Sequence, residues 1–147
     1  MLSSMPEERA SPMSLPEEIR DKKILLIDDD ESIRDSLRMF FLAEGLRIDA
    51  VETAEEGLDA LSRRHYDVII TDYNLPGMDG PSFFKRVHQL CPASFKILMT
   101  AYAKEPPVAA ADLGVDECIQ KPFSTKIIMD SLSRSTGKDG PRAREQG

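Results

Sequence analysis

The sequence predicts a three-layer α/β fold, in which helices cover both faces of a doubly wound parallel sheet. Between residues 22 and 135 the hydrophobic pattern switches repeatedly between a strand period and a helix period. Stretches such as "YDVIITD" (66–72) have an unbroken apolar centre, which is typical of strands buried on both faces. Five strand candidates alternate with five helix candidates. This alternation implies parallel crossover connections and helices on both sides of the sheet.

The first half of the pattern opens with "KILLID" (23–28), a short buried strand. A helix with one apolar face follows and ends at Gly45, and "LRIDAV" (46–51) then alternates as a strand does. Thr53 and Glu56 have the spacing of a capping box, which predicts the start of a second helix. The apolar face of the first helix is formed by Ile33, Leu37, Phe40 and Phe41.

The second half repeats the alternation after the third strand, 66–72. Pro81 suits the first turn of a helix whose apolar stripe is Phe84, Val87 and Cys91. The remaining elements are a strand at 95–100, a short helix at 107–114, a strand at 115–120 and a helix at 124–133.

The composition of the chain indicates its domain organisation and the classes of protein to which it does not belong. Residues 1–21 are rich in Pro, Ser and Glu, and we expect a flexible leader there, one folded domain over 22–135, and a flexible tail over 136–147. No signal pattern opens the chain and no apolar run approaches the roughly 18 residues of a membrane span, so we expect a cytoplasmic protein without membrane contact. The formal charge of −7 argues against direct nucleic-acid binding. Cys91 and Cys118 form no CxxC motif and are expected to be buried, reduced thiols.

Polar residues stand where the predicted strands end, which is the edge at which open α/β sheets bind ligands. Asp28 and Asp29 follow the first strand, and Asp72 ends the third. Thr100 ends the fourth strand, and the fifth leads into Lys121. We therefore expect three acids, a hydroxyl and an ammonium to converge at one edge.

The charges at this edge predict a cation. Three carboxylates and one ammonium leave two net negative charges, and each like-charge contact at about 4 Å costs roughly 4 kcal/mol at an effective dielectric near 20. Mg²⁺, which keeps several waters and leaves room for phosphate oxygens, fits so few carboxylates. Lys121 and Thr100 suit contacts to those oxygens. Asp72 stands alone on the middle strand and is the predicted nucleophile, since carboxylates form aspartyl phosphates. The neighbouring Asp30 and Glu31 are expected to cap the first helix.

Four motifs then resemble a known family. "LLIDDDES", "VIITDYNLPGMDG", "ILMTAY" and "IQKPF" occur in the order and approximate spacing of the receiver domain of two-component response regulators. The resemblance covers about residues 22–135. It implies a flavodoxin-like sheet with the strand order 2-1-3-4-5, and a cis peptide bond between Lys121 and Pro122.

The resemblance also implies a role for each matching residue. The matching positions are the phosphoacceptor Asp72, the Mg²⁺-binding pair Asp28 and Asp29, Asn74 as a metal ligand through its backbone carbonyl, and the phosphoryl contacts Thr100 and Lys121. The implied function is phosphorelay signalling: a histidine kinase or phosphotransfer protein donates the phosphoryl group, and hydrolysis removes it. No helix-turn-helix pattern follows residue 135, so we expect the output to reach a partner protein or an output domain elsewhere. Cys118 departs from the family, which often has Tyr or Phe three residues before the lysine.

Three alternatives remain open from the sequence. A metal-dependent phosphatase with an aspartyl nucleophile often has an acid two residues later, where this chain has Asn74. A flavodoxin-like electron carrier would need a phosphate-binding loop rich in Thr and Ser after the first strand, which is not present. A receiver that keeps its pocket but acts as a constitutive interaction module has no distinguishing pattern.

Overall fold

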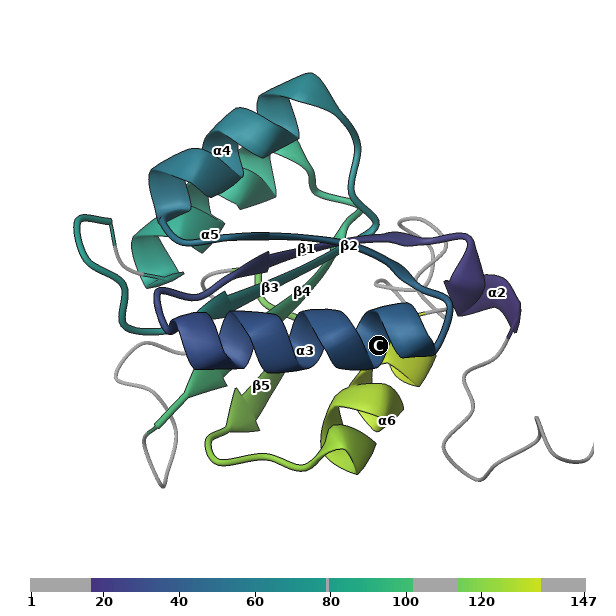
Figure 1. Ribbon diagram of the computed structural model, residues 1–147. Coiled ribbons are helices and arrows are strands. Elements are labelled where there is room, and N and C mark those ends of the chain that lie inside the picture. The colour runs from purple at the N-terminus through teal and green to yellow at the C-terminus, as the bar shows by residue number, and fades with distance from the viewer. Residues whose placement is uncertain (1–16, 79, 102–113, 136–147) are drawn as a thin grey trace, which may run out of the picture.

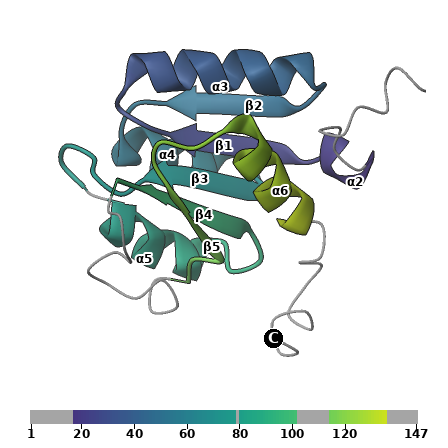
Figure 2. The ribbon, with the colours of Figure 1, turned by 90° about the horizontal axis from the view of Figure 1, so that it is seen from below.

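The protein folds around one five-stranded parallel sheet. The structure, a computed structural model, describes residues 17–78, 80–101 and 114–135. The strand order is β2-β1-β3-β4-β5, and every pairing is parallel, which confirms the predicted fold (Figure 2). The strands are β1 (Lys23–Ile27), β2 (Arg47–Val51), β3 (Val68–Asp72), β4 (Phe95–Thr100) and β5 (Glu117–Gln120).

Helices lie on both faces of the sheet. Figure 1 shows α4 and α5 on one face and α3 and α6 on the other. The predicted helix at 107–114 lies outside the described residues, apart from Gly114. The helices are α2 (Glu17–Arg20), α3 (Glu31–Ala43), α4 (Ala54–Arg63), α5 (Gly80–Leu90) and α6 (Thr125–Ser135).

The core has two halves because successive side chains of a strand point to opposite faces. Leu26 of β1 belongs to the half that contains Phe41 of α3 and Leu132 of α6. Leu25, the preceding residue, belongs to the half that contains Phe83 of α5. Every residue of β3 is buried, as its unbroken apolar centre predicts, and every residue of β4 is buried as well, Lys96 included. Fully burying one such aliphatic side chain stabilises the fold by about 1.5–3 kcal/mol.

Local signals start and end the helices where the sequence predicts. Asp30 is the N-cap of α3, and its carboxylate accepts from the amides of Ser32 and Ile33. Thr53 and Glu56 form a complete capping box at α4. Gly45 has φ 80°, a left-handed conformation that favours glycine, and it lies just after α3.

One turn of the expected leader is folded. Glu17–Arg20 form α2, and Ile19 is fully buried in the same half of the core as α3 and α6. The helical turn lies inside residues 1–21, where the sequence predicts a flexible leader, and the flexibility of that leader stays a prediction. A single helical turn is too short to show a hydrophobic period. The sequence pattern therefore could not predict that Ile19 is buried.

Strand register aligns the ends of the strands. Ile27 of β1 pairs with Thr71 of β3, so Asp28 and Asp72 follow side by side. Thr100 of β4 pairs with Gln120 of β5, so Lys121 comes directly after that pair. The carboxyl edge of the sheet thus collects the residues that the sequence singled out.

Candidate functional site

Asp28 is held tightly at the end of β1. It is completely buried, and its amide donates to the carbonyl of Val51 over 3.1 Å, the last such bond between β1 and β2. Its Oδ1 accepts from the amide of Asp30 at 2.9 Å, and its Oδ2 accepts from Lys121 Nζ at 3.2 Å. Asp29, the next residue, is exposed. The two neighbours therefore differ: Asp28 is fixed by the protein, and Asp29 faces the open side of the site.

Lys121 joins the first and third strands. Its Nζ lies 3.2 Å from Asp72 Oδ1 as well as 3.2 Å from Asp28 Oδ2. The amide of Lys121 donates to the carbonyl of Thr100 over 2.7 Å, which anchors the loop after β5. The peptide bond between Lys121 and Pro122 is cis, which confirms the expectation from the resemblance. One ammonium thus contacts two of the three acids.

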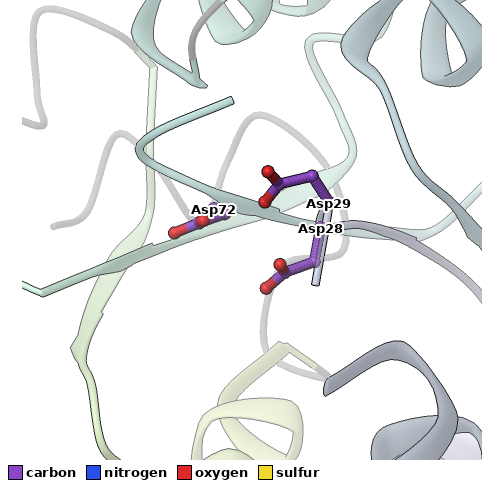
Figure 3. A group of neighbouring side chains, drawn as sticks. All are labelled: Asp28, Asp29 and Asp72. Atoms are coloured by element: carbon purple, nitrogen blue, oxygen red, sulfur yellow. The ribbon is translucent and has the colours of Figure 1, made fainter. Parts of the chain in front are cut away.

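The three acids form one cluster. One carboxylate oxygen from each of Asp28, Asp29 and Asp72 lies within 4.8 Å of the other two. Figure 3 shows that Asp28 and Asp29 come from the end of β1 and Asp72 from the neighbouring strand. With the ammonium of Lys121 counted, the cluster has two net negative charges. The all-oxygen donor set and this charge fit a hard divalent cation such as Mg²⁺.

The pKa values of Asp72 and Lys121 reflect this environment. Burial raises the pKa of Asp72; the ammonium of Lys121 opposes this, and the carboxylate of Asp28 adds to it. For Lys121, burial lowers the pKa, but the carboxylates of Asp28 and Asp72 outweigh burial, so its pKa is raised. The ammonium therefore stays protonated at neutral pH, while the ionised carboxylate of Asp72 is destabilised in the free site.

Thr100 and Asn74 stand differently. Thr100 is buried at the end of β4, one residue beyond Met99, which pairs with Asp72. Asn74 is exposed in the loop after β3, two residues past Asp72. The structure thus brings Asp28 and Asp72 into contact with Lys121 and places a carboxylate oxygen of Asp29 within 4.8 Å of the other two acids, with Thr100 at the same edge. The roles of Thr100 and of the Asn74 carbonyl remain predictions.

Sequence reasoning missed one residue next to the site. Arg34, in the second turn of α3, donates from Nη1 to the carbonyl oxygen of Asp28 over 2.8 Å. Arg34 is six residues after Asp28 and lies in the next element, so no repeat within a single helix or strand connects the two residues. The contact exists because α3 turns back along the end of β1.

The cysteines differ from expectation. Cys91 is only partly buried and Cys118 is exposed. Cys118 lies on β5, at one edge of the sheet, where positions 118 and 120 are both exposed. The apolar pattern of "VDECIQ" does not distinguish an edge strand from a central one, and this explains the error for Cys118.

Comparisons with known proteins identify the class. The sequence profile of the response regulator receiver domain matches residues 24–133, and the chain belongs to this family. The response regulator protein FleR of Pseudomonas aeruginosa is 33% identical over 126 residues, which are 85% of this chain and 27% of FleR. This chain therefore spans about a quarter of the length of that relative.

Solved structures agree with this assignment. A CheY-like receiver domain protein from Methanospirillum hungatei has a TM-score of 0.75 and 29% identity, and the alignment covers 86% of this chain and 98% of that one. The response regulator TrrA of Thermotoga maritima, solved in complex with Mg²⁺ and BeF, has a TM-score of 0.71 and 28% identity, with 78% and 98% covered. The fold, the acidic site and the family thus define a receiver domain of a two-component response regulator. Such domains are generally signalling modules rather than enzymes, receive phosphoryl groups from histidine kinases, and bind Mg²⁺ at an acidic pocket. Among residues 17–78, 80–101 and 114–135, no helix is long and apolar enough to cross a membrane.

Proposed function

We propose that this chain accepts a phosphoryl group on Asp72 in a Mg²⁺-dependent reaction. The observation that supports it most is the contact set of Asp72: it shares Lys121 with Asp28 and lies within 4.8 Å of both other acids. The carboxylate of Asp72 neighbours the ammonium of Lys121 and the pair of carboxylates of Asp28 and Asp29. This arrangement suits a nucleophile whose phosphorylated product carries added negative charge. In this proposal Asp28, Asp29, Asp72 and the carbonyl of Asn74 hold the ion.

The reaction is an exchange of one bond for another. A carboxylate oxygen of Asp72 attacks the phosphorus of a phosphohistidine, the P–N bond breaks, and the imidazole nitrogen keeps the electron pair and takes a proton from solvent. Bound Mg²⁺ would neutralise charge on the phosphoryl oxygens. Lys121 then supplies a point charge and Thr100 a hydroxyl donor to those oxygens. In autodephosphorylation, water attacks the same phosphorus and releases inorganic phosphate.

The proposed donor is a histidine kinase or a histidine phosphotransfer protein, and we place the reaction in the cytoplasm. The output is a change of conformation that a partner protein or an output domain reads. The carboxylate of Asp72 loses its negative charge at the phosphorylated oxygen and gains a dianionic group, so Lys121 has a stronger partner there than Asp28. A shift of Lys121 away from Asp28 is therefore the first movement that we propose.

The direct test is phosphorylation by a small donor. Purified protein is incubated with acetyl phosphate and Mg²⁺, and intact mass is measured with time. We expect a gain of one phosphoryl group that hydroxylamine removes, as an acyl phosphate requires. Chelation of Mg²⁺ should prevent the gain.

Two variants make the test specific. Asp72→Asn should take up no phosphoryl group, whereas Asp30→Asn, which changes an acid of the same motif outside the cluster, should behave as the wild type. An Asp72→Asn variant that gains one phosphoryl group at the wild-type rate would show that the nucleophile lies elsewhere. No gain in the wild type would favour a constitutive interaction module.

A further inference from the structure

The carbonyl oxygen of Asp28 does not accept the backbone hydrogen bond that a continued β1–β2 ladder would give it. In a parallel ladder, a residue whose amide donates to the carbonyl of Val51 accepts in turn from the amide of Thr53. Here Glu56 Oε1 takes the amide of Thr53 at 3.2 Å, and the amide of Glu52 at 2.9 Å. The capping box of α4 therefore ends the ladder one bond early. A buried carbonyl left without a donor would cost about 1–3 kcal/mol.

Arg34 replaces the missing donor. Its Nη1 lies 2.8 Å from the carbonyl oxygen of Asp28, and Asp28 itself is completely buried. Asp28 is thus held at three further points besides its amide: Asp30 and Lys121 hold its carboxylate, and Arg34 holds its carbonyl.

The held carbonyl belongs to the peptide unit that leads into Asp29. Because that unit is planar, fixing the carbonyl of Asp28 also fixes the amide and the Cα of Asp29. Asp29 needs this, since it is exposed and its side chain makes no hydrogen bond or ion pair within the described part of the chain. Nothing described besides its backbone directs its carboxylate toward Asp28 and Asp72 (Figure 3).

We infer that Arg34 is a positioning residue for the cation site: it orients the Asp28–Asp29 peptide so that the Asp29 carboxylate faces the cluster. The inference rests on the proposed Mg²⁺ site. Groups that orient metal ligands typically change metal affinity by about 10- to 100-fold when they are removed. Arg34 acts through the backbone, so the lower end of that range applies.

The sign of the effect separates positioning from charge. Arg34 brings a positive charge close to an acidic site, so a purely electrostatic role predicts tighter Mg²⁺ binding when the guanidinium is removed. A purely structural role predicts a lower melting temperature with unchanged Mg²⁺ affinity. Of the three roles, only positioning predicts that removing the guanidinium of Arg34 weakens Mg²⁺ binding.

Arg38 provides a matched control. It lies one helical turn after Arg34 and lines the same open groove beside β2, and within the described residues it makes no hydrogen bond or ion pair. Arg38→Met therefore removes the same charge and makes the same change in side-chain size as Arg34→Met. It leaves the hydrogen bond to the carbonyl of Asp28 in place.

The experiment measures the Mg²⁺ dissociation constant of the full chain by calorimetric titration, for the wild type, Arg34→Met and Arg38→Met. We expect about a 10-fold weaker constant for Arg34→Met and no weakening for Arg38→Met. The phosphorylation rate of Arg34→Met should approach that of the wild type at saturating Mg²⁺. Equal or tighter binding by Arg34→Met than by Arg38→Met would overturn the inference.

A second pair of variants provides the test if Arg34→Met does not fold. Arg34→Lys and Arg38→Lys both keep the charge, and only Arg34→Lys disturbs the donor to Asp28. Weaker Mg²⁺ binding by Arg34→Lys alone supports positioning, and equal binding by the two contradicts it. Because the binding measurement needs no phosphodonor, a wild type that binds Mg²⁺ but takes no phosphate would overturn the proposed function and leave the role of Arg34 to be judged separately.

Discussion

At the scale of single residues, burial destabilises the ionised carboxylate of Asp72. Its burial raises its pKa, so its ionised form is less favourable in the folded chain than in the unfolded one. Below its ordinary pKa of 3.8, both states hold the proton and the group has no effect. As the pH rises, the unfolded chain releases the proton first. Stability is therefore lost with rising pH through this window and stays lower at neutral pH.

Asp72→Asn should for this reason raise the melting temperature of the Mg²⁺-free protein at neutral pH. The amide cannot ionise, so the destabilisation is removed although the ion pair with Lys121 is lost as well. Melting curves of both proteins across acid and neutral pH check this. The gain should shrink toward acid pH, and a gain that is constant over the whole range would contradict the ionisation argument.

Asp30 and Asp29 are adjacent acids with separate roles. Asp30→Ala removes the N-cap of α3 and should lower the free energy of unfolding by about 1 kcal/mol. It should leave Mg²⁺ affinity nearly unchanged, because the Asp30 carboxylate accepts from helix amides. Asp29→Ala should do the reverse. Urea unfolding and Mg²⁺ titration of both variants separate the roles, and equal losses of Mg²⁺ affinity would merge them.

At the scale of secondary-structure elements, α4 packs closely against the sheet at Gly57. A Cβ atom on this glycine would lie 3.0 Å from Ile27 Cγ1 and 3.2 Å from Phe83 Cε1. These two side chains come from β1 and α5, so one missing side chain lets three elements meet. Gly57 is buried, as this contact requires.

Gly57→Ala should lower the free energy of unfolding by about 1 kcal/mol. Overpacking a core costs about 1–3 kcal/mol. The higher helix propensity of alanine offsets about 1 kcal/mol of that. Urea unfolding measures the change, with Ser62→Ala at an exposed position of α4 as the control. A Gly57→Ala variant that is more stable than the wild type would show that Ile27 and Phe83 can move aside.

Most of the secondary-structure elements are predictable from the sequence. All five strands and the described helices α3, α4, α5 and α6 overlap predicted stretches, and period, capping or turn signals support the prediction for α3, α4 and α5. The acidic site is also predictable, since strand ends of a parallel sheet share one edge. Residues whose role comes from a single tertiary contact are not: Ile19 in one turn of helix, and Arg34 on the carbonyl of Asp28.

At the scale of the whole molecule, the cation should stabilise the fold. A ligand that binds only the folded state adds RT ln(1 + [L]/Kd), which is about 2.7 kcal/mol at a concentration 100-fold above Kd. The melting temperature of the wild type should therefore rise with Mg²⁺ concentration. Asp29→Ala should flatten this rise, and K⁺ at matched ionic strength should not reproduce it. A rise of the same size in Asp29→Ala would place the cation elsewhere.

The contact between Lys121 and Asp28 joins residues 93 positions apart in the sequence, and this affects the order of folding. During synthesis the chain leaves the ribosome from its N-terminus, so Asp28, Asp29 and Asp72 are all available before Lys121 is made. Contacts between such distant residues also form late in folding, because a long loop must close first. Any stage of folding at which β1 pairs with β3 before β5 joins the sheet would bring the three carboxylates together without the ammonium of Lys121. A divalent cation bound at that stage would supply the missing positive charge, so the ion proposed for signalling would also favour the pairing of β1 with β3.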